Sequence, residues 1–342
     1  MSVIGSNVLA GASGSGGPGE VVAVAHNASP YISVYDWDSG FGSKYSDPST
    51  LPANVAFSVA FSPDGNDIAV GHASSPCVTV YPWSSSGFGT KYADPSTTPS
   101  GTGDGVAFSP DGNTIAVADQ SSPYIHAYAW SSGFGSKYSN PSTLPTASSY
   151  AVAWSPDGNN IAVGHFGAPR ITAYSWSSGF GSKYADPSTY PNNIAKGVAF
   201  SPDGNNLAAA HTNSPYITVY PWSSGFGTKY GNPSSSLPSE GRAVTFSPDG
   251  NDIAIAHEAS PYITVFPWSS GFGTKYSNPS TLPANHANGV GFSSDGDSIA
   301  VAHNGSPYIT AYPWSSGFGA KYADPSTSLP SQAYAVTFFA PS

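Results

Sequence analysis

Short runs of apolar residues, broken by turn-forming residues, dominate the chain. In one representative stretch, an apolar run at residues 59–62 stops at Pro63-Asp64-Gly65, where proline fixes φ and glycine supplies the positive φ of a tight turn. Residues 67–72 then place large side chains on one face and Ala and Gly on the other, which suits close packing of sheets. A β-branched and aromatic run at 78–83 and a segment at 87–92 complete the stretch. The pattern predicts four short strands joined by tight turns.

This stretch recurs with a nearly constant period. One tryptophan marks each unit, at spacings of 46, 47, 46, 46, 46 and 46 residues. The seven are Trp37, Trp83, Trp130, Trp176, Trp222, Trp268 and Trp314. Units of four strands are typical of propeller blades, whereas helical repeats of similar length show a 3.6-residue pattern that this chain lacks. We therefore predict an all-β, seven-bladed β-propeller with four antiparallel strands per blade.

The two ends of the repeated region complement each other. The first recognisable strand, 21–26, corresponds to the second strand of a unit, whereas the last, 335–339, corresponds to a first strand. We expect the C-terminal strand to complete blade one, because closure of the ring removes open sheet edges. The propeller is then predicted to span residues 20–342, and residues 1–19, which are rich in Gly and Ser, to form a flexible tether.

Charge and cysteine content restrict the partners that can be expected. Ten Lys and Arg against 20 Asp and Glu give a formal net charge of −10, which is unlike the basic footprint of nucleic-acid-binding proteins. The single cysteine, Cys77, permits neither an internal disulfide nor a multi-cysteine zinc site. No run approaches the ~20 apolar residues of a membrane span, and the first ten residues lack the features of a secretory signal. We predict no nucleic-acid partner, no membrane span, no metal and no cofactor.

The runs Val106 to Val117 and Val198 to Ala209 resemble WD40 and related propeller repeats, because a Val-Ala-Phe-Ser-Pro-Asp-Gly-Asn motif precedes an apolar strand in each. The resemblance extends over residues 20–342 and implies the propeller fold. The Trp-Asp and Gly-His dipeptides of WD40 repeats do not recur at their usual places, so the Asp-His-Ser-Trp network of that family is not carried over. Where its third strand has Trp, this chain has Tyr35, Tyr81, Tyr128, Tyr174, Tyr220, Phe266 and Tyr312.

The opening segment carries a second, shorter resemblance. Ile4-Gly-Ser-Asn-Val-Leu-Ala-Gly-Ala-Ser-Gly is similar to the start of tail or appendage proteins of marine bacteriophages. It implies an anchor, with Ile4, Val8 and Leu9 as its apolar residues, that attaches the globular domain to other virion proteins.

Histidine recurs at the end of the second strand. The positions are His26, His72, Asp119 in the third unit, His165, His211, His257 and His303. A ring of histidines could bind metal or titrate as a pH switch. The second strand is not the innermost one, however, so these side chains are expected to lie too far apart to share an ion. We interpret them as structural, each imidazole hydrogen-bonded to a nearby loop, and we interpret the repeated tryptophans as structural too.

The candidate ligand face is the one that carries the turns after the second strands. A Ser-Pro-Tyr turn recurs there with Tyr31, Tyr124, Tyr216, Tyr262 and Tyr308, while Cys77 and Arg170 stand in the other two units. The variable loops that precede the first strands are expected on the same face, with Tyr150, Lys196 and Arg242 near it. We expect Arg170, Tyr150 and Lys196 to form one sector that could bind an acidic glycan. The alternative is neutral drift among redundant copies, with the turn tyrosines simply starting the third strand.

No catalytic set emerges from the sequence. Nearly every polar candidate occurs six or seven times, whereas a catalytic triad or carboxylate pair requires one unique arrangement. Together with the opening segment, this favours a non-enzymatic virion structural or adhesion protein, a phage tail or fibre appendage located in the virion, with a host glycan as a possible ligand. The alternatives are a cytosolic WD40-type interaction scaffold and a propeller hydrolase.

Overall fold

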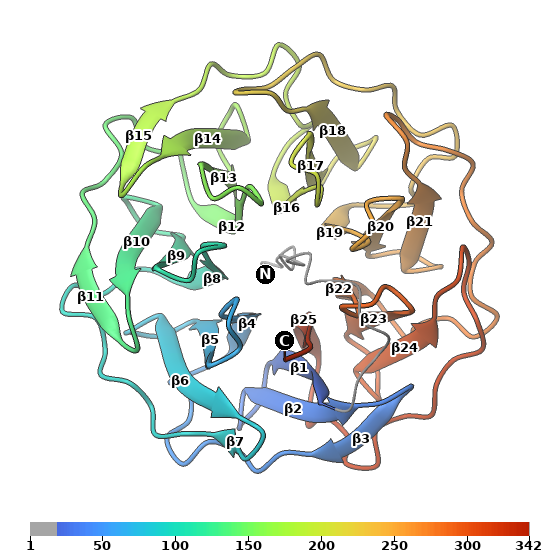
Figure 1. Ribbon diagram of the computed structural model, residues 1–342. Coiled ribbons are helices and arrows are strands. Elements are labelled where there is room, and N and C mark those ends of the chain that lie inside the picture. The colour runs from blue at the N-terminus through green and yellow to red at the C-terminus, as the bar shows by residue number, and fades with distance from the viewer. Residues whose placement is uncertain (1–18, 342) are drawn as a thin grey trace.

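The computed structural model describes residues 19–341, which form a ring of seven antiparallel sheets around a central axis (Figure 1). Each sheet is one blade, and the predicted all-β, seven-bladed propeller is confirmed. The innermost strands of blades one to seven are β25 (Ala333–Phe339), β4 (Ala56–Phe61), β8 (Gly103–Phe108), β12 (Ser149–Trp154), β16 (Ala195–Phe200), β19 (Gly241–Phe246) and β22 (Ala287–Phe292). None of residues 19–341 lies in a helix that could cross a membrane.

The remaining strands follow outward in sequence order. The second strands are β1 (Glu20–His26), β5 (Asp67–His72), β9 (Thr114–Asp119), β13 (Asn160–His165), β17 (Asn206–His211), β20 (Asp252–His257) and β23 (Ser298–His303). The third strands are β2 (Ile32–Trp37), β6 (Val78–Ser84), β10 (Ile125–Trp130), β14 (Ile171–Trp176), β18 (Ile217–Pro221), β21 (Ile263–Pro267) and β24 (Ile309–Pro313). The outermost strands are β3 (Phe41–Lys44), β7 (Gly87–Phe88), β11 (Phe134–Lys137) and β15 (Phe180–Lys183). In blades five to seven the fourth strand is reduced to a single bridge between the repeated Trp and a Phe.

The ring is closed by the C-terminal strand, as predicted. β25 pairs antiparallel with β1, in a register that joins Val21 to Phe339 and Ala25 to Ala335. Residues 1–18 of the predicted tether, with its anchor residues Ile4, Val8 and Leu9, lie outside the described residues.

Small residues on the inner strands allow adjacent blades to approach closely. Gly71 on β5 shows why: a Cβ there would lie 2.7 Å from the backbone oxygen of Gly103 in the next blade and 2.4 Å from Ser58 Oγ. Larger side chains fill the space between blades, and each apolar cluster combines residues from neighbouring sheets. Packing between blades therefore supplies the core in place of a layer of helices.

The repeated tryptophans link the blades in a closed chain of ring contacts. Each packs edge-on against a tyrosine of the preceding blade, with centroid distances of 5.0 to 5.4 Å, and Tyr322 with Trp37 closes the circle. The third-strand tyrosines add a second link, since each hydroxyl donates to a backbone oxygen of the loop arriving from the preceding blade. Phe266 lacks this hydroxyl. These contacts place the seven tryptophans in the core, as the repeat predicts.

Candidate functional site

The repeated histidines are paired within their own blades. Each is fully buried, and Nε2 lies 2.8 to 3.1 Å from a Ser or Thr hydroxyl on the third strand. These partners are Ser33, Thr79, Thr172, Thr218, Thr264 and Thr310. The Nε2 partner is thus a strand hydroxyl, and the expected loop bond is found at the other ring nitrogen of His257, whose Nδ1 lies 2.8 Å from the backbone oxygen of Ala259. Burial lowers the pKa of each of the six histidines to about 4, because the interior disfavours the imidazolium.

Blade three has an equivalent buried pair, but its histidine lies on the third strand and its partner, an aspartate, on the second. Asp119 occupies the histidine position, and His126 occupies the hydroxyl position, with Nε2 3.1 Å from Asp119 Oδ2. The Asp119 carboxylate also accepts from the backbone N–H groups of Ser100, Gly101 and Ser121. The pair is buried, although His126 Nδ1 has no hydrogen-bond partner among the described residues, so it offers no solvent-accessible catalytic dyad.

A β-bulge on every inner strand places one residue per blade toward the central channel. The register of each inner strand against the second strand shifts around this residue. The seven are Phe57, Asp104, Tyr150, Lys196, Arg242, Asn288 and Tyr334. Because almost every other position repeats, this channel ring is the place where the blades differ most. Bulges often re-aim side chains at functional sites.

Members of the channel ring contact one another across the axis. Lys196 Nζ lies 3.9 Å from the ring centroid of Tyr150 in the adjacent blade. Lys196 is only 7% exposed, and burial together with the charge of Arg242 lowers its pKa to about 8, against the opposing effect of Asp104 two blades away. Asp104 is fully buried. The predicted site residues Tyr150 and Lys196 therefore do meet, but as an enclosed pair; Lys196 is not the flexible surface cation that the sequence suggested.

The remaining ring members are also held in place. Arg242 forms ion pairs with Glu240, at 2.7 Å, and with Glu258. Phe57 packs on Tyr334 at 5.2 Å, and Asn288 donates to the backbone oxygen of Ala333 at 2.8 Å. Most members of the channel ring thus have a partner within the protein, and Arg242 is paired with two carboxylates.

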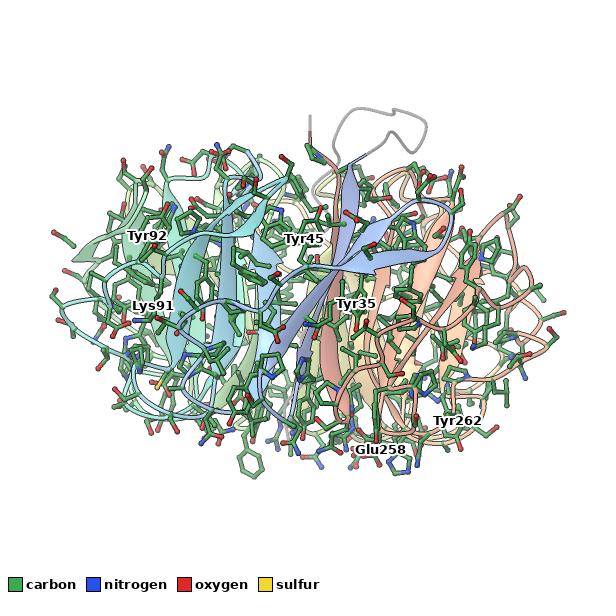
Figure 2. All side chains as sticks on the ribbon, turned by 90° about the horizontal axis from the view of Figure 1, so that it is seen from below. Tyr35, Tyr45, Lys91, Tyr92, Glu258 and Tyr262 are labelled. Atoms are coloured by element: carbon green, nitrogen blue, oxygen red, sulfur yellow. The ribbon has the colours of Figure 1, made fainter. Side chains whose placement is uncertain are left out.

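The turns after the second strands lie at one edge of the disc, where Figure 2 shows Tyr262 with Glu258 of blade six. Variable loops reach the same edge, since backbone N–H groups just after the second strands donate to these loops, as Phe166 does to Ser148. Tyr31, Tyr124, Tyr216, Tyr262 and Tyr308 are half-buried and adopt φ near +70°, as does Arg170 at +73°. The turns and the variable loops therefore share one edge as predicted, and most of the turn tyrosines pack against the apolar clusters of the core.

A groove of about 460 Å³ opens on this face between blades four and five. The β13–β14 turn forms one wall; the loop entering β16, the β17–β18 turn and the segment that follows β18 form the other. Its larger polar or aromatic side chains are Arg170, Tyr190, Asn192, Asn193, Lys229 and Asn232, and the smaller polar ones are Thr189, Ser214 and Thr218. The lining includes neither Tyr150 nor Lys196, so Arg170 belongs to a site separate from the channel ring.

The groove is positively charged in a chain whose net charge is −10. Arg170 and Lys229 line it, and no Asp or Glu is among its lining residues. Most of the equivalent outer lysines pair with an Asp three residues later, as Lys183 does with Asp186. Lys229 instead donates to the neutral amide of Asn232 and to the backbone oxygen of Tyr230, at 3.0 Å. Its charge is therefore not neutralised by a local carboxylate.

Four departures from the repeat meet at this groove. Arg170 replaces the turn Tyr, and Phe166 stands where other blades have Asn, Ala, Gln, Thr or Glu. Tyr190 replaces residues such as Leu51 and Leu282, and Asn192 begins an Asn-Asn pair found in no other loop of this kind. Phe166 and Tyr190 are 50% and 47% exposed, the highest values among the large apolar side chains of the described range. Departures from the repeat in the β13–β14 turn and in the loop entering β16 thus lie at the same groove.

Backbone strain marks the same place. Asn193 has φ +80°, the left-handed region that Asn tolerates better than most residues. No other non-glycine residue in the equivalent loops of residues 19–341 has positive φ. Such strain is often found at functional sites.

Sequence reasoning identified Arg170 but missed the rest of the groove. Tyr190, Asn192 and Lys229 are not among the predicted site residues, although comparing the loops before each first strand singles out Tyr190. Comparing the third strands likewise reveals His126. In residues 19–341, no group of three or more His, Cys, Asp or Glu side chains is placed to hold a metal ion.

No family model matches the sequence, and no curated protein matches it. Solved structures resemble the fold. The periplasmic gluconolactonase of Pseudomonas aeruginosa is 16% identical, with a TM-score of 0.69 over 94% of this chain and 100% of its own. A Bacteroides uniformis protein provisionally assigned as a 6-phosphogluconolactonase is 15% identical, with TM-score 0.69 and coverage of 94% and 100%. The β-propeller domain of Cps50 (Swd1) from Myceliophteria thermophila is 13% identical, with TM-score 0.59 and coverage of 82% and 89%.

These comparisons correct the functional hypothesis. The predicted virion structural or adhesion role is contradicted, because the structures that share the fold along nearly the whole chain include propellers named as lactonases, and the phage resemblance has no support among them. The marine-phage segment itself lies in residues 1–18, outside the described range. At 13 to 16% identity these likenesses show the fold alone: the chain is a seven-bladed β-propeller.

Proposed function

We propose that this protein is a non-catalytic binding propeller that takes an anionic ligand in the groove between blades four and five. The observation that carries the proposal is that Arg170 and Lys229 both line the groove, whose lining contains no carboxylate. Ligand pockets are typically about 300–1,000 Å³ with a few convergent polar groups, and the groove falls within that range.

Because the protein as a whole is acidic, this groove stands out as a place where an anion can bind. A net charge of −10 repels anions over most of the surface, so only a local excess of cations can hold one. Arginine suits this task because its planar guanidinium can donate two parallel hydrogen bonds to a carboxylate or phosphate, while Lys229 contributes a point charge.

The groove's chemistry fits binding better than turnover. Its lining offers cations, amides and hydroxyls, with no histidine or carboxylate to act as a general base. The six repeated histidines are buried and bonded to strand hydroxyls, which supports a structural role for them.

Removal of either cation is expected to weaken anion binding at least tenfold. A hydrogen bond to a charged group contributes about 1.5–3 kcal/mol, and two such contacts correspond to a Kd for a simple anion in the millimolar range. Citrate and inorganic phosphate titrated against the full chain, with NMR chemical shifts or calorimetry as readout, test this with Arg170→Ala and Lys229→Ala.

The matched control is Lys91→Ala, which removes the equivalent outer lysine of another blade, where Asp94 neutralises it. This variant should bind like the parent. Equal binding by all three variants, or no binding by the parent chain, would refute the groove as an anion site.

A second candidate function is hydrolysis of a sugar lactone at the channel ring. It is favoured by Lys196, which is enclosed beside Tyr150. The pKa of Lys196, lowered to about 8, would make its neutral amine accessible as a base near physiological pH. The names of two structural relatives, a gluconolactonase and a provisional 6-phosphogluconolactonase, suggest the substrates to try.

The two proposals are separated by an assay of gluconolactone and 6-phosphogluconolactone hydrolysis, in which a pH-stat measures the acid released. The binding proposal predicts no rate above spontaneous hydrolysis. The lactonase proposal predicts a rate that rises through pH 8 and falls roughly 100-fold or more in Lys196→Met. Lys91→Met is the control for loss of a lysine elsewhere.

A further inference from the structure

This inference rests on the proposed anion-binding function and names the class of ligand. We infer that the groove binds an acidic saccharide, that is, a sugar ring carrying a carboxylate or phosphate. Three features of the groove lead to this class: its cations, an exposed aromatic ring, and a row of side-chain amides.

The cations define one end of the ligand. Arg170 belongs to the β13–β14 turn of blade four and Lys229 to blade five, so the two charges come from opposite walls of the groove. An anionic group between them would contact both blades. The guanidinium of Arg170 also lies 5.9 Å from the ring centroid of Phe166, a contact that orients it.

The aromatic ring supplies the feature that a simple anion does not need. Tyr190 lines the groove with 47% of its surface exposed, at a position where four other loops have Leu or Thr. Aromatic faces pack against the apolar C–H faces of sugar rings, and a tyrosine hydroxyl adds a hydrogen-bonding tip. The adjacent backbone is fixed, because the Tyr220 hydroxyl donates to the oxygen of Thr189 at 2.7 Å. The ring is therefore presented by an ordered loop.

The amides match the hydroxyl groups of a sugar. Asn192, Asn193 and Asn232 all line the groove, and each amide can both donate and accept. The Asn192 Nδ2 donates to the backbone oxygen of Ser214 at 2.8 Å, which orients its side chain across the groove wall. Sugar hydroxyls likewise donate and accept, whereas inorganic phosphate or citrate, which chiefly accepts, would use mainly the N–H groups of such a row.

The proposal is tested by comparing ligands that differ in one feature. Glucuronate, glucose 6-phosphate, glucose, inorganic phosphate and acetate are titrated against the full chain by calorimetry and by NMR. We expect at least one acidic sugar to bind ten times or more tightly than both its free anion and neutral glucose. Whether glucuronate or glucose 6-phosphate binds more tightly assigns the anion as carboxylate or phosphate.

Variants then separate the sugar contact from the charge contact. Tyr190→Ala should reduce acidic-sugar binding about tenfold and leave phosphate binding unchanged, whereas Arg170→Ala should weaken both. Leu282→Ala, which truncates the equivalent loop residue before blade seven, is the matched control and should bind like the parent. Melting curves by tryptophan fluorescence confirm that each variant remains folded.

Two outcomes would overturn the inference and differ in meaning. If acidic sugars bind no more tightly than phosphate, and Tyr190→Ala has no effect, the saccharide class is wrong while the anion groove stands. If neither sugars nor simple anions bind, both the acidic-saccharide inference and the proposed anion-binding function are wrong.

Discussion

Acidification from pH 7 to pH 5 is expected to unfold the propeller. Six buried histidines have pKa values lowered to about 4, whereas a histidine in the unfolded chain titrates near 6.5. Between these values the unfolded state binds protons that the folded state excludes. The stability contributed by the neutral histidines is therefore complete above pH 6.5 and is lost as pH falls toward 4.

The effect is large because six equivalent groups act together. Together the six groups lower the free energy of unfolding by about 7 kcal/mol per pH unit near pH 5, against a typical total of 5–15 kcal/mol. The turn carboxylates, whose pKa values are lowered by hydrogen bonds from Ser and Asn, act in the same direction. Glu20, Asp67 and Asp252 oppose it, because burial raises the pKa of these three groups.

Urea titrations followed by tryptophan fluorescence at pH 8, 7, 6 and 5 measure this dependence. His257→Gln removes one titrating group, so it should reduce the pH slope by about one sixth, whatever its effect on stability at pH 8. A urea midpoint that stays constant from pH 7 to pH 4.5 would show that the buried histidines are not the acid-sensitive groups.

Deletion of residues 333–342 is expected to destroy the monomeric fold. The deletion removes β25, the inner strand of blade one, and with it the buried side chains of Tyr334, Val336 and Phe338. Large apolar side chains contribute about 1.5–3 kcal/mol each when buried, so these three alone account for roughly 6 kcal/mol. The exposed edge of β1 would then be free to pair with other chains.

Size-exclusion chromatography with light scattering detects the expected aggregation. Deletion of residues 340–342, beyond the end of β25, is the control and should give a monomer with unchanged Tm. A soluble monomeric product from the longer deletion, melting at the parent temperature, would contradict the role of β25 in closure.

The architecture could be predicted from the sequence because every blade repeats the same local signals. The tight turn at Pro63-Asp64-Gly65 and the small side chains of β5 each dictate structure over a few residues. Closure was also predictable, because a first strand was missing at one end and left over at the other. The reduction of the fourth strand in blades five to seven was not predicted, although a proline precedes the repeated Trp in these blades, whereas the three blades with a four-residue fourth strand have Asp36, Ala129 and Ser175 there.

The candidate site was predicted only in part, because it depends on contacts between segments distant in the chain. Arg170 was singled out by its departure from the repeat. Lys229, across the groove, is a repeated residue, and it lacks a neutralising carboxylate only because Asn232 stands where four other blades have an aspartate. Burial was equally hidden: Lys196 follows a variable loop and looks exposed in the sequence, yet a bulge turns it into the channel. To predict the Asp119–His126 pair, one would have to compare two positions of the repeat at once, the end of the second strand and the second residue of the third strand.

The pairing of β1 with β25 also sets the order in which the molecule can fold. In the other six blades each strand pairs with strands nearby in the sequence, so these blades can form locally and early. Blade one instead joins segments about 300 residues apart, and closing such a loop costs ~5 kcal/mol of chain entropy if the intervening chain is flexible. Once the other blades are formed, that chain is already curved and its ends are close. We therefore expect ring closure to be the last step of folding, and its reversal the first step of unfolding.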